Sequence, residues 1–600
     1  MSFTRPFALS LMRRLLLASL GIALAACAQQ AQRAAPAAAP ASAQAQANAP
    51  APKAAAAPKA AETADAAAQA ALPKQELTEE VLYEYLLAEI AGQRGALGLS
   101  AQAYADLARQ TRDPRIARRA AEVALYARMP GAAIDAAKIW YEAEPDSMSA
   151  LQALTSLLIG AKRQDEALPY LQKMLERHGD GDGFLQLSRL LAGSQDKAQS
   201  LKLVQQLAQP YPKVAQAHFA LAQAALGADD VALALAETRA ASKLKPDWEL
   251  PVLLEAQLLQ RQSNALALQR LAEFLQQHPK SREVRLGYAR LLVTQQKYTE
   301  ARAEFQTLSK DFPDNADVVF AVGVLSLQLD DYKLAETNFK RLLALPYRDK
   351  DTVRMYLGQI EEDQKNYPEA LRWYDEVGGG DLYLRAQMRY ALVLSKQGKL
   401  DAARAHLRQV EPGSAEGRVQ LLLTEAQMLR DAKRPEEAFN LIGDALKNMP
   451  EQPELLYDYA MVAEKLGRMD LLESSLKEVI RLQPDHAHAY NALGYSLADR
   501  NMRLPEARQL IEKALSLAPE DPFIIDSMGW VLYRQGKQQQ ALEYLRKAYS
   551  ARADPEIAAH LGEVLWMAGE HGEAEKIWLE ANKKTPDNDA LNSTIKRFKP

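Results

Sequence analysis

From Leu77 onward, apolar residues recur at helical spacing in segments of 12 to 15 residues, and short polar breaks separate these segments. No segment shows the alternation of β-branched and polar residues that is typical of a strand. The pattern therefore predicts an all-α chain. Each predicted helix has an apolar stripe that it cannot bury alone, so neighbouring helices are expected to stack against one another.

A repeat of about 34 residues runs through these predicted helices and is clearest near the C-terminus. Each of the last three units has a glycine after a bulky residue, an alanine about twelve positions later, and then a proline. These positions are Gly494, Ala507 and Pro519; Gly529, Ala541 and Pro555; and Gly562, Ala574 and Pro586. A second alanine follows the first in each unit, at Ala514, Ala548 and Ala581.

The small residue at the glycine position recurs upstream at intervals of 33 to 35 residues. The fifteen positions are Ala88, Ala121, Thr155, Ser188, Ala222, Ala256, Ala289, Gly323, Gly358, Ala391, Ala426, Ala460, Gly494, Gly529 and Gly562. Chance imitates two or three such units, but it does not produce fifteen in register. The signal is weakest at residues 75–115 and 180–280, where the aromatic and glycine positions are often replaced.

Each position in the unit has a physical role. The glycine lies where the two helices of a hairpin come into close contact, and the first alanine holds the second helix against the first. The second alanine lies at the contact with the next hairpin. The proline cannot continue the second helix and therefore ends the unit.

This unit resembles the tetratricopeptide repeat. The resemblance implies a right-handed superhelical solenoid of about 15 helical hairpins over residues 75–586. Residues 587–600 are expected to form a final capping helix that covers the last apolar face. In that family the first helices of the hairpins line a concave surface, which holds an extended peptide or a helix of another protein.

The N-terminal residues have the layout of a secretory signal peptide. Two arginines follow Met12, and the apolar run that comes next has ten residues, which is too short to span a bilayer. The run ends in Leu24-Ala25-Ala26-Cys27, which resembles the bacterial lipobox. Residues 1–26 are therefore predicted to be a lipoprotein signal peptide. The alternative is an ordinary signal peptide cut near Ala26. Met1 and Met12 are both candidates for the start.

Cys27 is the only cysteine, which excludes a disulfide within the chain. By the same resemblance its thiol carries the lipid, and several acyl chains on one residue give stable anchoring. Residue 28 is alanine and not aspartate, which in gram-negative lipoproteins favours the outer membrane. The Ala, Pro and Gln composition of the residues that follow predicts that 27–74 is a lipidated cysteine with a flexible tether. The solenoid would then face the periplasm.

Composition and motifs exclude several classes of function. The 600 residues carry a net charge of −4, so the basic excess of nucleic-acid-binding domains is absent. Gly378-Gly379-Gly380 lacks the lysine of a phosphate loop, and His486 and His488 have no further ligand-rich segment for a metal. The sequence therefore predicts no enzyme, no cofactor, no metal and no small-molecule substrate. The membrane is expected to be contacted only through the lipid.

Aromatic residues next to amide and charged groups suit peptide recognition, and such a set lies on the predicted first helices of the last three repeats. The candidate peptide-binding residues of the concave face are His488, Asn491, Tyr495, Phe523, Asp526, Trp530, Tyr533, Arg534, Glu563 and Trp566. The alternative is that Tyr495, Trp530 and Trp566 are buried between repeats. The family's carboxylate clamp is incomplete here, because the full Lys, Asn and Arg set is missing.

An arginine cluster near the N-terminus is a candidate docking surface for an acidic partner. Its members are Arg109, Arg112, Arg115, Arg118, Arg119 and Arg128. Acidic residues are interleaved with them, at Asp106, Asp113 and Glu122. Such a run is more often a solvated helix face than a binding site.

The whole layout of lipobox, tether and repeats resembles the outer-membrane tetratricopeptide lipoproteins of gram-negative bacteria. One branch of that family is the adaptor of a periplasmic carboxyl-terminal processing protease, which it activates and supplies with substrates such as peptidoglycan hydrolases. The resemblance implies an adaptor that binds other proteins, namely a periplasmic protease and its substrates. The alternative is a structural scaffold for envelope assembly or export machinery.

Overall fold

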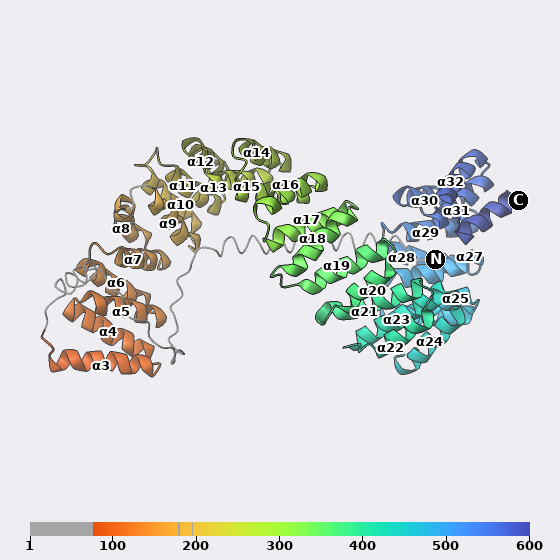
Figure 1. Cartoon of the computed structure of the whole chain (residues 1–600), viewed down its shortest axis with the longest axis horizontal. Coiled ribbons are helices and arrows are strands. Elements are labelled where there is room, and N and C mark those ends of the chain that lie inside the picture. The colour runs from red at the N-terminus through yellow and green to blue at the C-terminus, as the bar shows by residue number, and fades with distance from the viewer. Residues whose placement is uncertain (1–75, 178–180, 195, 600) are drawn as a thin grey trace. The chain divides into compact units, whose positions relative to one another are not determined.

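The computed structural model describes residues 76–177, 181–194 and 196–599. These residues form 31 α-helices, α3 to α33, and one short 3-10 helix, and they contain no strand (Figure 1). The predicted all-α class is confirmed. The predicted signal peptide and the whole of the predicted tether, residues 1–74, lie outside the described residues.

The described chain divides into two compact units at Leu325 and Ser326, inside the helix α17. We call residues 76–325 the N-terminal unit and residues 326–599 the C-terminal unit. The helices of the N-terminal unit are α3 (Glu79–Gln93), α4 (Leu97–Thr111), α5 (Pro114–Tyr126), α6 (Pro130–Ala143), α7 (Met148–Gly160), α8 (Gln164–Arg177), α9 (Asp182–Ala192), α10 (Lys197–Ala208), α11 (Ala215–Gly227), α12 (Val231–Leu244), α13 (Glu249–Gln260), α14 (Asn264–Gln277), α15 (Arg282–Thr294) and α16 (Tyr298–Asp311).

The helix at the division is α17 (Ala316–Gln328). The helices of the C-terminal unit are α18 (Tyr332–Ala344), α19 (Lys350–Asp363), α20 (Tyr367–Asp375), α21 (Tyr383–Lys396), α22 (Leu400–Gln409), α23 (Ala415–Asp431), α24 (Pro435–Asn448), α25 (Pro453–Lys465), α26 (Met469–Leu482), α27 (Ala487–Asp499), α28 (Leu504–Leu517), α29 (Pro522–Arg534), α30 (Gln538–Ala551), α31 (Pro555–Met567), α32 (His571–Lys584) and α33 (Asp589–Phe598).

In chain order, the odd-numbered helices α3 to α31 are the first helices of fifteen helix pairs. The two helices of a pair pack against each other from α3–α4 to α7–α8 and from α11–α12 to α15–α16 in the N-terminal unit, and from α19–α20 to α31–α32 in the C-terminal unit. All fifteen small residues of the sequence repeat lie on the first helix of a hairpin. Fourteen of them are buried, whereas Ser188 on α9 is only half-buried. The predicted register is therefore confirmed through the whole ladder, with a local irregularity at α9.

The glycines of the last repeats lie at the close contact between the two helices of their hairpins, as predicted. A Cβ atom on Gly494 would come within 2.7 Å of Ile511 Cγ1 and 2.8 Å of the Ala507 carbonyl oxygen. A Cβ on Gly529 would lie 2.6 Å from Leu545 Cγ. These distances are shorter than van der Waals contact, so only glycine lets the two helices approach this closely.

The alanine and proline positions also have their predicted roles, with one correction. The first alanine of each of the last three units, at Ala507, Ala541 and Ala574, is completely buried. Prolines such as Pro519 follow the end of a second helix by two residues. Pro555 differs, because it is the first residue of α31 and does not directly follow α30. Proline is tolerated there, since the first helical N–H has no intrahelical acceptor.

The turn inside most hairpins has a residue in the left-handed conformation two positions after the first helix ends. Gly536 with φ 78° and Gln296 with φ 58° are examples. This is the common C-terminal cap that ends a helix and reverses the chain. The described residues of the α9–α10 turn and the α13–α14 turn contain no such residue, which marks both hairpins as irregular.

The last helix, α33, corresponds to the predicted capping helix. Asn588 caps its start, because its side-chain oxygen accepts a hydrogen bond of 2.9 Å from the Leu591 N–H. Leu591 is fully buried, and Ile595 and Phe598 pack against the core of the last repeat. Within the described ranges, no helix is both long and apolar enough to cross a membrane.

Candidate protein-binding faces

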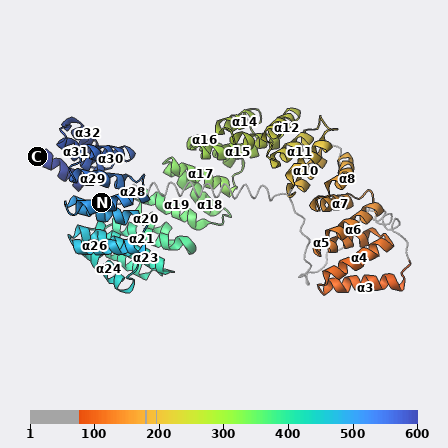
Figure 2. The same ribbon diagram turned by 180° about the vertical axis from the view of Figure 1, so that it is seen from behind.

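The candidate residues near the C-terminus lie on α27, α29 and α31, the first helices of three successive hairpins (Figures 1 and 2). Side-chain caps stabilise the starts of α27 and α29. The Asp521 carboxylate accepts hydrogen bonds from the Phe523 and Ile524 N–H groups at the start of α29. His486 Nδ1 accepts the Ala489 N–H at the start of α27, so this histidine serves as a cap.

A network of polar and aromatic groups connects the three helices around His560 of α31. His560 Nδ1 lies 2.8 Å from Asp526 Oδ2 on α29, and His560 Nε2 lies 3.2 Å from the hydroxyl of Tyr495 on α27. The Trp530 ring stacks on the imidazole with a centroid distance of 4.3 Å. Trp530 Nε1 donates to Asp499 Oδ1 at 3.3 Å. We call Tyr495, Asp499, Asp526, Trp530 and His560 the His560 network.

Burial and charge shift the pKa values in the His560 network. Burial opposes protonation of His560, but the carboxylates of Asp526, Asp499 and Glu556 outweigh it and raise the pKa of the imidazole. Burial also raises the pKa of the Asp526 carboxyl, because the nearby His560 offsets only part of the desolvation. Burial raises the pKa of Tyr495 well above its ordinary value. These groups therefore hold protons more tightly than they do in water.

The structure corrects part of the sequence prediction for this face. Four of the ten candidate residues are buried, with exposed fractions of 2 to 5%: Asn491, Asp526, Trp530 and Glu563. They belong to the packing between repeats, so the prediction that they present themselves to a peptide is wrong for the free protein. The remaining six are half-buried: His488, Tyr495, Phe523, Tyr533, Arg534 and Trp566. A role of these six in peptide binding stays a prediction.

Trp566 lies outside the His560 network. Its ring stacks on Trp578 of the second helix at 5.7 Å and lies 6.3 Å from Phe598 of α33. Glu563 also contacts α33, because its carboxylate pairs with Arg597 of that helix. The same carboxylate accepts a hydrogen bond from the Tyr533 hydroxyl of α29. Trp566 and Glu563 therefore stabilise the attachment of the last helix.

His560 was not among the candidate residues predicted from the sequence. Asn491 and Asp526 lie three residues before the repeat glycines Gly494 and Gly529, whereas His560 lies two residues before Gly562. His560 is therefore one position out of register with the other two. The sequence alone did not indicate that Asp526 and His560 contact each other across the repeats.

The arginine cluster lies on α4 and α5 and in the short segment between them, with Arg128 just after α5. Five of its side chains are more than half exposed and pair with carboxylates: Arg109 with Asp106, Arg112 with Glu142, Arg115 with Asp113, and Arg118 and Arg119 with Glu122. Such pairs on the surface contribute little to stability. These exposed ion pairs are what a solvent-exposed helix face is expected to show. Docking of an acidic partner on the arginine cluster stays a prediction.

The sequence analysis missed an exposed apolar face on α3. This helix is the first described helix of the N-terminal unit (Figure 1). Five large apolar side chains of this helix are 43 to 67% exposed: Leu82, Tyr83, Tyr85, Leu86 and Ile90. Terminal repeats of soluble solenoids ordinarily have a polar outer face. The signal was present in the sequence, because apolar residues occur on all sides of this segment and not in a single stripe.

No group of three or more His, Cys, Asp or Glu side chains that suits a metal ion occurs in the part of the chain that the structure describes. The polar groups described above form caps, ion pairs and inter-repeat contacts. The fold and these contacts are those of a helical repeat protein, a class whose surfaces bind other proteins.

Comparison with known proteins identifies the family. Models of the tetratricopeptide repeat match residues 258–319, 323–381, 453–486, 473–522 and 527–589. A TPR repeat-containing protein of Pseudomonas aeruginosa is 39% identical over 527 residues, which cover 87% of this chain and 88% of that protein. The chain belongs to the family of tetratricopeptide-repeat proteins, which ordinarily act as scaffolds for protein–protein interaction.

Two further relatives are more distant. Cellulose synthase operon protein C of Pseudomonas fluorescens is 25% identical over 468 residues, which cover 67% of this chain but 34% of that protein. A crystal structure of a thermophilic TPR protein from Thermus thermophilus is 24% identical and has a TM-score of 0.28. It covers 30% of this chain and 97% of the Thermus protein.

Proposed function

We propose that this protein is a lipid-anchored adaptor that faces the periplasm from the outer membrane and holds other proteins together there. The proposal joins the predicted lipid on Cys27 and the tether up to residue 74 with the tetratricopeptide repeats of the described chain. The predicted tether has 47 residues, and a flexible coil of that length has an average reach of about 40 Å. An anchored solenoid on such a tether reaches partners well away from the membrane surface.

The observation that carries the proposal is the apolar face of α3. Tyr83 and Leu86 are 67% and 47% exposed and lie within one turn of each other on this helix. A contiguous apolar face that is exposed to water promotes aggregation unless another protein covers it. We infer that α3 docks a partner protein by helix packing, with Tyr83 as a large anchor.

The partner that the family resemblance implies is a periplasmic carboxyl-terminal processing protease. In this proposal the adaptor recruits and activates the protease and presents substrates such as peptidoglycan hydrolases. The chain itself is not expected to cleave anything.

Affinity purification of the full-length protein from detergent-solubilised envelopes tests the proposal. We expect the wild-type protein to recover a serine protease of this class together with its substrates. The double variant Tyr83→Asp/Leu86→Asp should lose the protease and remain folded, because neither side chain belongs to the core. Leu579→Asp is the matched control, since Leu579 is 71% exposed on α32 and should retain the partner. Equal recovery by all three proteins would contradict docking at α3.

The lipid anchor is tested separately. Cys27→Ser should move the protein from the outer-membrane fraction to the soluble periplasmic fraction, because the side chain that receives the lipid is gone. Outer-membrane fractionation that is unchanged in Cys27→Ser would overturn the anchor while leaving the adaptor proposal intact.

A second candidate function is a structural scaffold for envelope assembly or export machinery. The similarity to cellulose synthase operon protein C favours this alternative, because the name of that relative refers to a biosynthetic operon. Deletion of the protein distinguishes the two functions. A scaffold of this kind predicts a defect in assembly or export with unchanged hydrolase levels, whereas the adaptor predicts that hydrolases accumulate.

A further inference from the structure

The hairpin of α9 and α10 is shorter than its neighbours. α9 has 11 residues and α10 has 12, whereas α11 and α12 of the next hairpin have 13 and 14. The turn after α9 also lacks a left-handed residue among its described positions. Ser188 is the one residue of the small-residue ladder that is not fully covered. A cavity lies beside this short hairpin.

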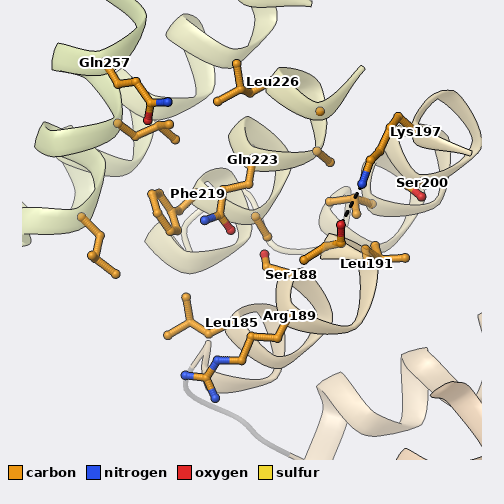
Figure 3. Close-up of a pocket in the computed structure, with 17 residues that line it drawn as sticks. Leu185, Ser188, Arg189, Leu191, Lys197, Ser200, Phe219, Gln223, Leu226 and Gln257 are labelled. Atoms are coloured by element: carbon orange, nitrogen blue, oxygen red, sulfur yellow. Dashed lines mark hydrogen bonds between the residues drawn. The ribbon is translucent and has the colours of Figure 1, made fainter. Parts of the chain in front are cut away.

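The cavity has a volume of about 540 Å³ and lies among α9, α10, α11 and α13 (Figure 3). Its apolar lining includes Leu185, Phe219, Leu226, Leu250 and Leu254. Leu250 is 46% exposed, which is unusual for a large aliphatic side chain beside a cavity. The volume and the apolar lining are those of sites that bind one large side chain or a small ligand.

The charged residues that line the cavity are Arg189 and Lys197, and no carboxylate is among the lining residues. Neither cation takes part in an ion pair within the described residues. Lys197 Nζ donates a hydrogen bond of 2.8 Å to the Ala192 carbonyl oxygen at the end of α9 (Figure 3). The cavity is therefore apolar inside and positively charged at its edge, in a chain whose net charge is negative.

Three polar side chains of the lining share one place in the repeat. Arg189, Gln223 and Gln257 are each separated by 34 residues, and they lie on the first helices α9, α11 and α13. All three are exposed. Packed helices lie about 8 to 10 Å apart, which is close to the length of three residues of an extended chain. A peptide that crosses these helices meets one donor from each of them at regular steps.

Ser188 adds an unsatisfied group to the same wall. Its hydroxyl oxygen is shielded from solvent and has no hydrogen-bond partner within the described residues. A buried polar group without a partner is costly, and a bound peptide group removes that cost.

We propose that this cavity binds an extended peptide segment in which one large apolar side chain is flanked by acidic residues. The apolar side chain enters the cavity between Phe219 and Leu254, and the acidic residues contact Arg189 and Lys197. The amides of Gln223 and Gln257 contact the peptide backbone. A fatty acid also combines an apolar chain with a negative charge. It has no backbone amides, however, that could hydrogen-bond to Gln223 and Gln257.

The proposal goes beyond the adaptor function, since it concerns a second face of the N-terminal unit and needs neither the lipid nor the protease. The direct test is fluorescence anisotropy with the full-length protein and a labelled peptide of sequence Ser-Asp-Glu-Phe-Asp-Glu-Ser. We expect saturable binding that weakens as salt is raised. A peptide with Ser in place of Phe, and one with Lys in place of the acidic residues, should each bind at least about tenfold more weakly.

Substitutions test whether the peptide binds at the cavity. Leu250→Asp and Arg189→Glu should each weaken the labelled peptide at least about tenfold, because they put negative charge beside its acidic residues. The matched controls are Leu266→Asp on α14, where the leucine is 45% exposed, and Lys202→Glu on α10. Both controls should bind like the wild type.

Three outcomes would overturn the proposal: no saturable binding, equal binding of all three peptides, or equal effects of the cavity variants and their controls. Displacement of cis-parinaric acid by oleate, in a protein that does not bind the peptide, would assign the cavity to a fatty acid and also overturn it. None of these outcomes bears on the α3 face, so this proposal and the adaptor proposal fail independently.

Discussion

His560 and Asp526 form an ion pair that joins two successive repeats, with 2.8 Å between His560 Nδ1 and Asp526 Oδ2. The pair is almost fully shielded from solvent, since the two side chains are 14% and 3% exposed. Tyr495 and Trp530 enclose the imidazole from its other sides. The last repeats therefore share a polar contact inside an otherwise apolar stack.

The first prediction concerns the pH dependence of this contact. The pKa of His560 is raised above the ordinary value of about 6.5, so the stabilising effect is complete below that pH. It is lost as the pH rises through the raised pKa. The raised pKa of the Asp526 carboxyl also favours lower pH, but its stabilising effect begins to be lost above its own ordinary value of 3.8. We expect the urea midpoint of unfolding to fall as the pH is raised above about 6.5.

The double variant Asp526→Asn/His560→Gln removes both titrating groups and should show a shallower fall. The measurement is tryptophan fluorescence during urea unfolding at each pH, because Trp530 and Trp578 lie in these repeats. His571→Gln is the control, since His571 is exposed on α32 and is not part of the network. An identical pH profile in the double variant and the wild type would refute the assignment.

The second prediction concerns the close helix contact at Gly494. Gly494→Ala should lower the free energy of unfolding by about 1–3 kcal/mol, because the new methyl group meets the Ala507 carbonyl oxygen, which cannot move without shifting α28. Gly572→Ala on α32 is the control. A Cβ there meets nothing within 4 Å, so the change should be neutral or stabilising by about 0.5 kcal/mol. Equal destabilisation by the two substitutions would contradict the role of Gly494.

The third prediction concerns the turn at Gln296, which adopts φ 58° although it is not glycine. Gln296→Gly should stabilise the N-terminal unit by about 0.5–1 kcal/mol, because a side chain is strained in the left-handed region. Gln295→Gly, at φ −88°, should destabilise it. Thermal unfolding followed by circular dichroism measures both. A loss of stability in Gln296→Gly would show that its side chain makes a contact worth more than the strain.

The fourth prediction concerns the attachment of α33. Arg597→Ala leaves the Glu563 carboxylate, which is 6% exposed, without its charged partner. We expect destabilisation of about 1 kcal/mol and earlier exchange of the amide hydrogens of α33. Lys596→Ala removes an exposed positive charge from the same helix and serves as the control. Adding Glu563→Gln to Arg597→Ala should recover part of the loss, and no recovery would indicate that Arg597 acts through packing alone.

The sequence by itself determined the fold to an unusual extent. The ladder from Ala88 to Gly562 identified all fifteen hairpins and the side of each helix that faces its partner, because a repeat protein is held together by contacts that are short in sequence. The contact of Gly494 with the second helix follows from the same repeat. The residue types needed at such contacts are restricted to small side chains, so they can be read directly from the chain.

Tertiary structure decided which polar groups meet across repeats. Asn491, Trp530 and Glu563 have the composition of a recognition surface, but burial assigns them to packing, since side-chain depth depends on the rotation between neighbouring repeats. The pairing of His560 with Tyr495 spans 65 residues and has no local signal. The cavity beside Ser188 is bounded by residues of α9, α10, α11 and α13, so it depends on how four helices pack and has no local sequence signal.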